Sequence, residues 1–169
     1  MCEFSWALMW KKGAVVAAIE IRTATKSDSE YVCRLALLLL SELYPEMYSL
    51  DQLRPVVADI LAQSNDVVAF IATHGDQAIG LITVNRCTAI YAFGDFGEIS
   101  ELYVNPEFRS SGLGARLLQK AVEHAEAQGW SMLEVGAPDV PKWQRTVDFY
   151  VENEFSIVGP RLYRLITDK

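Results

Sequence analysis

Cysteine and histidine are scarce in this sequence. Its 169 residues include three cysteines (Cys2, Cys33 and Cys87) and two histidines (His74 and His124). An odd number of irregularly spaced cysteines does not make a disulfide framework, and no Cys/His cluster has the spacing of a zinc site. We therefore expect neither structural disulfides nor a bound metal.

Basic residues are outnumbered by acidic ones. Fifteen Lys and Arg residues against 22 Asp and Glu give a net charge of −7. Proteins that bind nucleic acids use Lys and Arg to replace the counterions of the phosphates. The acidic balance therefore excludes general nucleic-acid binding and favours cationic small molecules or basic peptides as partners.

Long hydrophobic runs are also missing. The run Leu35–Leu40 is far shorter than the roughly 20 apolar residues that cross a bilayer. The apolar stretch Met1–Trp10 is followed by its lysines, whereas a secretory signal begins with them. We treat residues 1–15 as an uncertain leader and expect a single domain over residues 16–169, in a cytoplasmic protein without a membrane segment.

Hydrophobic periodicity predicts a sheet covered by helices. Alternating or continuous apolar runs predict strands at 18–23, 67–73, 78–84, 98–104, 130–135, 156–158 and 161–166. Apolar stripes at helical spacing predict helices at about 27–43, 50–63, 112–128 and 142–153. Residues 94–97, Gly-Asp-Phe-Gly, predict a tight turn. This order of elements favours a mixed sheet with helices packed on it.

The segment Glu101–Arg116, ELYVNPEFRSSGLGAR, carries the clearest chemical signal. A predicted strand runs into a loop and then into a helix, whose first turn has amide groups without internal partners and a dipole that favours an anion. Glycines at 112 and 114 leave space for a phosphate, and Arg109 can add a charge-assisted contact. The segment predicts a pyrophosphate-binding loop made mostly of backbone.

Two common nucleotide-binding loops do not fit these residues. The dinucleotide fingerprint requires a third glycine where Leu117 stands. The Walker loop requires Lys and Ser or Thr after the second glycine, where this sequence has Ala115 and Arg116. On the glycines alone, an ordinary helix-opening turn with a solvated Arg109 is the simpler interpretation.

The surrounding residues resemble the acetyl-CoA motif of the GNAT superfamily of N-acetyltransferases. The run Arg109-Ser-Ser-Gly112-Leu-Gly114 matches the family pattern Arg/Gln-x-x-Gly-x-Gly/Ala, and Phe149-Tyr150 with Phe155 is similar to a C-terminal family segment. The resemblance extends over residues 18–166. It implies an α/β (α+β) fold with a mixed, mostly antiparallel central sheet, helices on both faces and a splayed parallel strand pair.

The chain also departs from the family pattern. Trp143 stands where the family often has Asn, Thr146 where it often has Ala, and Glu154 where it often has Gly. These differences concern the last helix, on the pantetheine side, and leave the phosphate loop unchanged.

The resemblance implies that acetyl-CoA, as acetyl donor, lies between the strands at 98–104 and 130–135. The backbone of Leu102, Tyr103 and Val104 would pair with the pantetheine amides. The pyrophosphate would be held by Arg109, Ser110, Ser111, Gly112, Leu113, Gly114 and Ala115.

The resemblance also implies direct attack of an amine on the thioester. A backbone N–H near Val104 would stabilise the oxyanion, and Tyr150 would donate to the leaving thiolate. Glu98 and Glu101 are both candidates for the base or for gripping the acceptor. Their separation of three positions places them on opposite faces of a regular strand, unless the bulge found in this family re-aims one of them.

We therefore expect an N-acetyltransferase that acetylates a primary amine of a small molecule or peptide. The acceptor should carry a positive charge, because the chain is acidic and two glutamates flank the expected reaction centre. A non-catalytic acyl-CoA-binding module and an interaction protein without CoA affinity are the alternatives, and a homodimer is left open. No Gly-x-Ser-x-Gly nucleophile motif is present.

Overall fold

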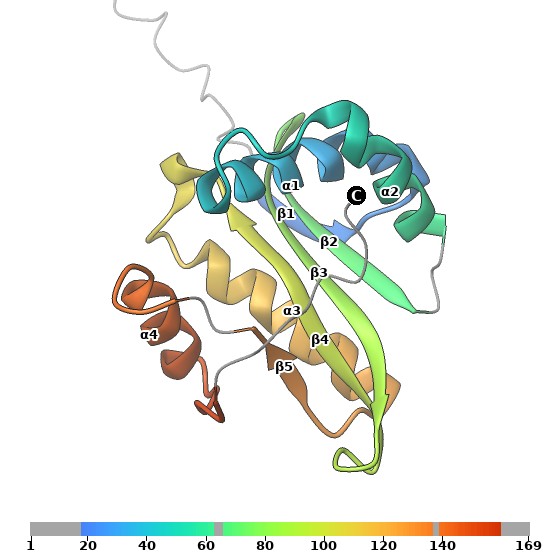
Figure 1. Ribbon diagram of the computed structural model, residues 1–169. Helices are drawn as coiled ribbons and strands as arrows, with labels where there is room; N and C mark the ends of the chain where they lie inside the picture. Colours follow the sequence, from blue (N-terminus) through green and yellow to red (C-terminus); the bar gives the residue numbers. More distant parts are fainter. Residues whose placement is uncertain (1–17, 63–65, 137–138, 160–169) are drawn as a thin grey trace, which may run out of the picture.

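The computed structural model describes residues 18–62, 66–136 and 139–159 (Figure 1). The uncertain leader at 1–15 and the strand expected at 161–166 lie outside the described residues. The elements, in chain order, are β1 (Ile19–Thr23), the 3-10 helix η1 (Lys26–Asp28), α1 (Ser29–Leu43), α2 (Leu50–Ala62), β2 (Val67–His74), β3 (Gln77–Ala89), β4 (Gly94–Val104), the 3-10 helix η2 (Pro106–Phe108), α3 (Leu113–Gln128), β5 (Leu133–Val135) and α4 (Gln144–Glu152).

The five strands form one sheet in the order β1-β2-β3-β4-β5. All neighbouring pairs are antiparallel except β4 and β5, which run parallel. The mixed, mostly antiparallel sheet that we expected is confirmed. A parallel pair requires a crossover, and α3 supplies it between β4 and β5.

Helices cover both faces of the sheet, and each face has its own apolar core. Leu81 of β3 packs with residues of α1 and α2, while the next residue, Ile82, packs with residues of α3. Alternation along the strand thus sends successive side chains into opposite cores. Figure 1 shows α4 at the β5 side of the sheet, next to α3, and its Tyr150 belongs to the α3 core.

The predicted turn at 94–97 is wrong. These residues begin β4, and the turn lies before them, at 90–93. Asp95 pairs with Thr88 across the hairpin, and its carboxylate accepts hydrogen bonds from Thr88 (2.6 Å) and Arg86 (2.6 Å). These cross-strand bonds keep the segment extended although it contains two glycines.

Two other strand predictions need correction. The strand expected at 130–135 is reduced to Leu133–Val135, because the chain is still leaving α3 at Trp130, whose amide bonds the carbonyl of Ala125 (2.9 Å). Residues 156–158 are exposed and irregular, and no described strand lies beside them. An isolated strand has no partner for its backbone groups and is not stable.

Candidate active site

Strands β4 and β5 pair only over Gly97–Ile99, in the first half of β4. The register ends with Ile99 opposite Val135, while β4 continues to Val104. Among the described residues, β5 therefore leaves the second half of β4 unpaired on that side. The free stretch contains the backbone expected to bind pantetheine, namely that of Leu102, Tyr103 and Val104. A free strand edge offers N–H and C=O groups to any extended amide chain.

The loop from β4 to α3 turns sharply before the helix. Ser110 and Gly112 both have positive φ, 61° and 82°. The Ser111 hydroxyl donates a hydrogen bond to the carbonyl of Phe108 (2.6 Å). A Cβ placed on Gly112 would meet no described atom within 4 Å. The space in front of the helix is therefore open.

Helix α3 begins with free amide groups. No side chain of the described residues caps it, and the amide of Arg116 is the first to bond back, to the carbonyl of Gly112 (3.1 Å). The amides of Leu113, Gly114 and Ala115 are left for an anion, as the sequence predicts for the first turn of this helix.

Gly114 has a different neighbour from the one that the sequence suggests. A Cβ on this residue would lie 3.4 Å from ring atoms of Phe149 and 3.9 Å from a methyl of Val104. The missing side chain therefore lets α4 pack closely on the start of α3. The space beside its Cα is therefore taken by protein, not left clear for a phosphate as we expected from the sequence.

Arg109 is engaged on the other side of the loop. Its Nη2 lies 2.5 Å from the Glu42 carboxylate, and its Nε donates to the carbonyl of Val104 (2.8 Å). The guanidinium also lies over the ring of Tyr103, 5.6 Å from the ring centre. Arg109 thus joins the loop to the end of α1, and its charge is matched by a carboxylate.

Arg145 is a loop contact that the sequence interpretation missed. Its Nη2 donates to the Ser110 hydroxyl (2.7 Å), which brings a guanidinium from α4 to the phosphate loop. Only its place, five residues before Tyr150 in the last predicted helix, could have drawn attention to it. Hydrophobic periodicity does not show which side chain of α4 contacts the loop that precedes α3.

A bulge in β4 places both candidate glutamates on one face of the sheet. Glu101 pairs with Thr83, but Ile99 pairs with Val84, so Ser100 is an extra residue. Ile99 packs in the α3 core, and its neighbour Glu98 therefore faces the α1–α2 side, as Glu101 does. The expected bulge is present, and the two glutamates share the face of the sheet that α1 and α2 cover.

The two carboxylates have different surroundings. The Thr83 hydroxyl donates to Glu101 Oε2 and accepts the amide of Glu101 (3.1 Å). Burial raises the pKa of Glu101, and the Thr83 hydrogen bond opposes part of that rise. Glu98 lies 3.7 Å from the Cys87 thiol and pairs in register with Glu134 of β5. A carboxyl with a raised pKa is a stronger proton acceptor once it is ionised.

Tyr150 is buried on the α3 side of the sheet. Its ring packs edge-on against Phe149 and Phe155, with centroids 5.2 and 5.4 Å away. Burial raises the pKa of the hydroxyl above its usual value, so it stays protonated at neutral pH. It lines a groove of about 730 Å³ between α3, β5 and α4.

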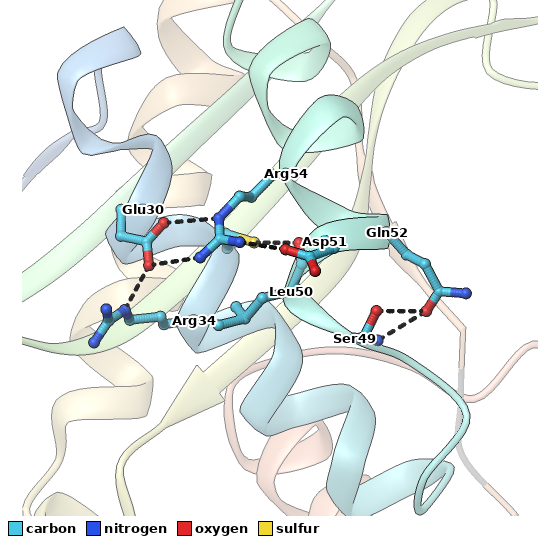
Figure 2. Close-up of polar contacts among 8 residues, drawn as sticks. Glu30, Arg34, Ser49, Leu50, Asp51, Gln52 and Arg54 are labelled. Carbon is cyan, nitrogen blue, oxygen red and sulfur yellow. Dashed lines mark hydrogen bonds and ion pairs between the residues drawn. The ribbon is translucent and has the colours of Figure 1, made fainter.

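A polar network fixes α2 against α1 on the acceptor side (Figure 2). Arg54 of α2 reaches Glu30 of α1 (3.2 Å) and Asp51 of its own helix (2.6 Å). Arg34 also bonds Glu30 (2.8 Å). Exposed pairs of this kind contribute little stability each, and of these three only Arg54–Glu30 joins the two helices. No sequence motif marks this network.

Two findings concern metal ions and membranes, and both hold for the residues that the structure describes. No group of three or more His, Cys, Asp or Glu side chains is placed to hold a metal ion. None of the helices is long and apolar enough for a bilayer.

Comparison with known families identifies the class. Residues 36–152 match the sequence model of the Acetyltransferase (GNAT) family. The chain belongs to this family. Its members carry out acetyl transfer to an amine, so the chemistry expected from the loop and the fold expected from the element order are both those of the family. The resemblance drawn from Arg109 to Gly114 is confirmed.

Two curated relatives support the same class. The chain is 33% identical over 111 residues to an uncharacterized N-acetyltransferase of Archaeoglobus fulgidus, covering 63% of this chain and 74% of the relative. It is 28% identical over 128 residues to the aminoalkylphosphonate N-acetyltransferase of Salmonella typhimurium, covering 76% and 80%. Both relatives carry names of N-acetyltransferases.

Solved structures show the same fold. A possible acetyltransferase from Clostridium difficile superposes with a TM-score of 0.74 at 18% identity, covering 88% of this chain and 99% of the other. An aminoglycoside acetyltransferase from an uncultured soil metagenomic sample, in complex with sisomicin, gives a TM-score of 0.72 at 18% identity, covering 89% and 97%.

Proposed function

We propose that this GNAT enzyme transfers the acetyl group of acetyl-CoA to a primary amine of a small-molecule or peptide acceptor. The observation that carries the proposal is that the free edge of β4 and the free amides of α3 follow one another along the chain, as the two parts of a CoA site would. The free stretch of β4 leads through a short loop to the uncapped amides of α3. A pantetheine arm needs strand-like amide partners, and a diphosphate needs clustered N–H groups.

The donor would lie along this path with its thioester between β4 and β5. Leu102–Val104 would pair with the pantetheine amides, and the amides of Leu113, Gly114 and Ala115 would bind the diphosphate. The thioester then reaches the sheet between Tyr150 on the α3 side and the glutamates on the α1–α2 side. Family membership and the positions of these groups support this placement.

The transfer requires one new bond and one broken bond. A carboxylate, Glu101 or Glu98, first takes a proton from the ammonium, and the free amine nitrogen then attacks the thioester carbonyl and loses its second proton as the amide forms. The oxyanion is stabilised by a backbone N–H near Val104. The C–S bond then breaks, and Tyr150 donates a hydrogen bond or proton to the departing thiolate. The raised pKa of Tyr150 keeps its hydroxyl in the donor state.

The acceptor is best described as a cation. Glu98, Glu101 and Glu134 lie on the same face of β4 and β5, and the whole chain carries a charge of −7. Such a field concentrates ammonium groups near the thioester. The names of two similar proteins mention amine compounds, aminoalkylphosphonates and aminoglycosides. They support small amines as the first compounds to test.

A thiol-release screen tests the proposal. Purified protein with acetyl-CoA is offered polyamines, aminoglycosides, amino acids, aminoalkylphosphonates and peptides, and free CoA is followed with a thiol reagent. We expect release that depends on a cationic amine. Binding of acetyl-CoA without amine-dependent release would favour the non-catalytic acyl-CoA-binding alternative. A melting temperature unmoved by millimolar acetyl-CoA would contradict both, because a ligand at a hundred times its Kd stabilises by about 2.7 kcal/mol.

A further inference from the structure

Two guanidinium groups border the phosphate loop, and they differ in what they bind. Arg109 is paired with Glu42 and with the carbonyl of Val104. Arg145 contacts the neutral hydroxyl of Ser110, and no described carboxylate pairs with it. Of these two guanidinium groups at the loop, the one without a described carboxylate partner is therefore that of Arg145.

The position of Arg145 is fixed by the packing of α4. Arg145 and Phe149 are four residues apart, so they share one face of the helix. The ring of Phe149 is the neighbour that a Cβ on Gly114 would meet at 3.4 Å. The face of α4 that carries Arg145 thus lies against the first turn of α3, where the free amides begin. Both the packing and the hydrogen bond to Ser110 place the guanidinium beside these amides.

We propose that Arg145 pairs with the diphosphate of the donor and makes the enzyme select a CoA thioester over pantetheine thioesters that lack a diphosphate. This inference rests on the proposed use of acetyl-CoA. A guanidinium forms short, charge-assisted and often bidentate hydrogen bonds with phosphate oxygens. The Ser110 hydroxyl holds the guanidinium at the loop before the donor arrives, which reduces the conformational entropy lost on binding.

The inference assigns different roles to the two arginines of the loop. Arg109, which the sequence motif predicts as a phosphate contact, positions the loop against the end of α1 through Glu42. Arg145 supplies the charge. Removal of Arg145 should therefore weaken only the donors that carry the diphosphate, whereas a merely structural side chain would affect every donor equally.

The test compares three donors, acetyl-CoA, acetyl-dephospho-CoA and S-acetylpantetheine, in the parent, Arg145→Ala and Arg145→Lys enzymes. Lys142→Ala, which removes one positive charge three residues earlier, is the matched control. In Arg145→Ala we expect KM for acetyl-CoA and acetyl-dephospho-CoA to rise about tenfold to a hundredfold, the loss of a charged hydrogen bond. KM for S-acetylpantetheine should stay within twofold, and Arg145→Lys should recover part of the loss.

Three results would overturn the inference. These are an unchanged KM for acetyl-CoA in Arg145→Ala, an equal loss with S-acetylpantetheine, or an equal loss in Lys142→Ala. An increase limited to acetyl-CoA would also overturn it, since it would place Arg145 at the 3′-phosphate instead. If Arg145→Ala does not fold by circular dichroism, Arg145→Gln replaces it. A parent enzyme inactive with acetyl-CoA and every amine would refute the proposed function itself, whereas an active parent with an unaffected variant refutes Arg145 alone.

Discussion

The hydroxyl of Thr83 makes two hydrogen bonds to Glu101, so the substitution Thr83→Val separates the chemistry of this carboxylate from its packing. Thr83 is buried, and its hydroxyl accepts the amide of Glu101 (3.1 Å) and donates to Oε2. Valine keeps the shape of the side chain and removes both bonds.

The size of the effect follows from the two bonds. Burial raises the pKa of Glu101 and the Thr83 hydroxyl lowers it. Loss of the hydroxyl therefore raises the pKa further, and a base that must be ionised then needs a higher pH. A hydrogen bond to a charged group contributes about 1.5–3 kcal/mol, so activity on the rising side of the pH profile should fall about tenfold to a hundredfold. The Glu101 amide then loses its hydrogen-bond partner, which should lower the free energy of unfolding by about 1–3 kcal/mol.

The assay is the pH dependence of turnover with saturating donor, together with thermal melts. We expect the rise of kcat with pH to move to higher pH in Thr83→Val and to return in Thr83→Ser, which restores the hydroxyl. The activity at high pH should approach that of the parent. A uniform loss of kcat at every pH, or an unshifted profile in a folded variant, would show that Glu101 is not the base that Thr83 positions.

Four other outcomes are expected. Tyr150→Phe should lower turnover roughly tenfold to a thousandfold with the acetyl-CoA Kd nearly unchanged, because only the donor hydroxyl is lost; equal turnover under conditions where chemistry limits the rate would leave Tyr150 a packing residue. Gly112→Ala should cost about 1–2 kcal/mol in thermal melts, since its φ is 82°, and should weaken acetyl-CoA binding by calorimetry; unchanged binding would move the phosphate elsewhere. Asp28→Asn should destabilise the fold by about 2 kcal/mol at neutral pH, a buried-pair cost reduced because the partner Arg22 is partly exposed. The Arg22 guanidinium holds the pKa of Asp28 below its usual range, so the parent has this stability above the unfolded pKa and loses it as pH falls, and a difference that persisted in strong acid would refute the charge argument. Glu98→Gln should raise KM for the amine and reduce its increase with salt; an uncharged acceptor with a salt-independent KM would exclude the cationic site.

Much of the fold follows from local patterns. The stripe of Leu113, Leu117 and Leu118 predicts α3, and Gly129 marks its end with φ of 70° and an amide bond to Ala125. The apolar run at 78–84 predicts a strand, and the structure buries its Leu81 and Ile82 in opposite cores. These predictions agree with the structure because each depends only on residues that are close in the sequence.

Boundaries that depend on a partner strand could not be predicted in the same way. The hairpin of β3 and β4 extends to Ala89 and Gly94 because Asp95 bonds side chains of the opposite strand. Glycines at 94 and 97 locally favour a turn, and cross-strand bonds reverse that preference.

The sequence by itself determined the family, and it predicts the phosphate loop and the site residues, because Arg109 to Gly114 and Phe149-Tyr150 are local motifs whose spacing is written in the chain. Only the tertiary structure decided how these residues act. The bulge at Ser100 places Glu98 and Glu101 on one face, Glu42 takes the charge of Arg109, and α4 brings Arg145 to Ser110. Each of these contacts joins residues from different elements, and their distance is set by how helices and strands pack, which no local pattern encodes.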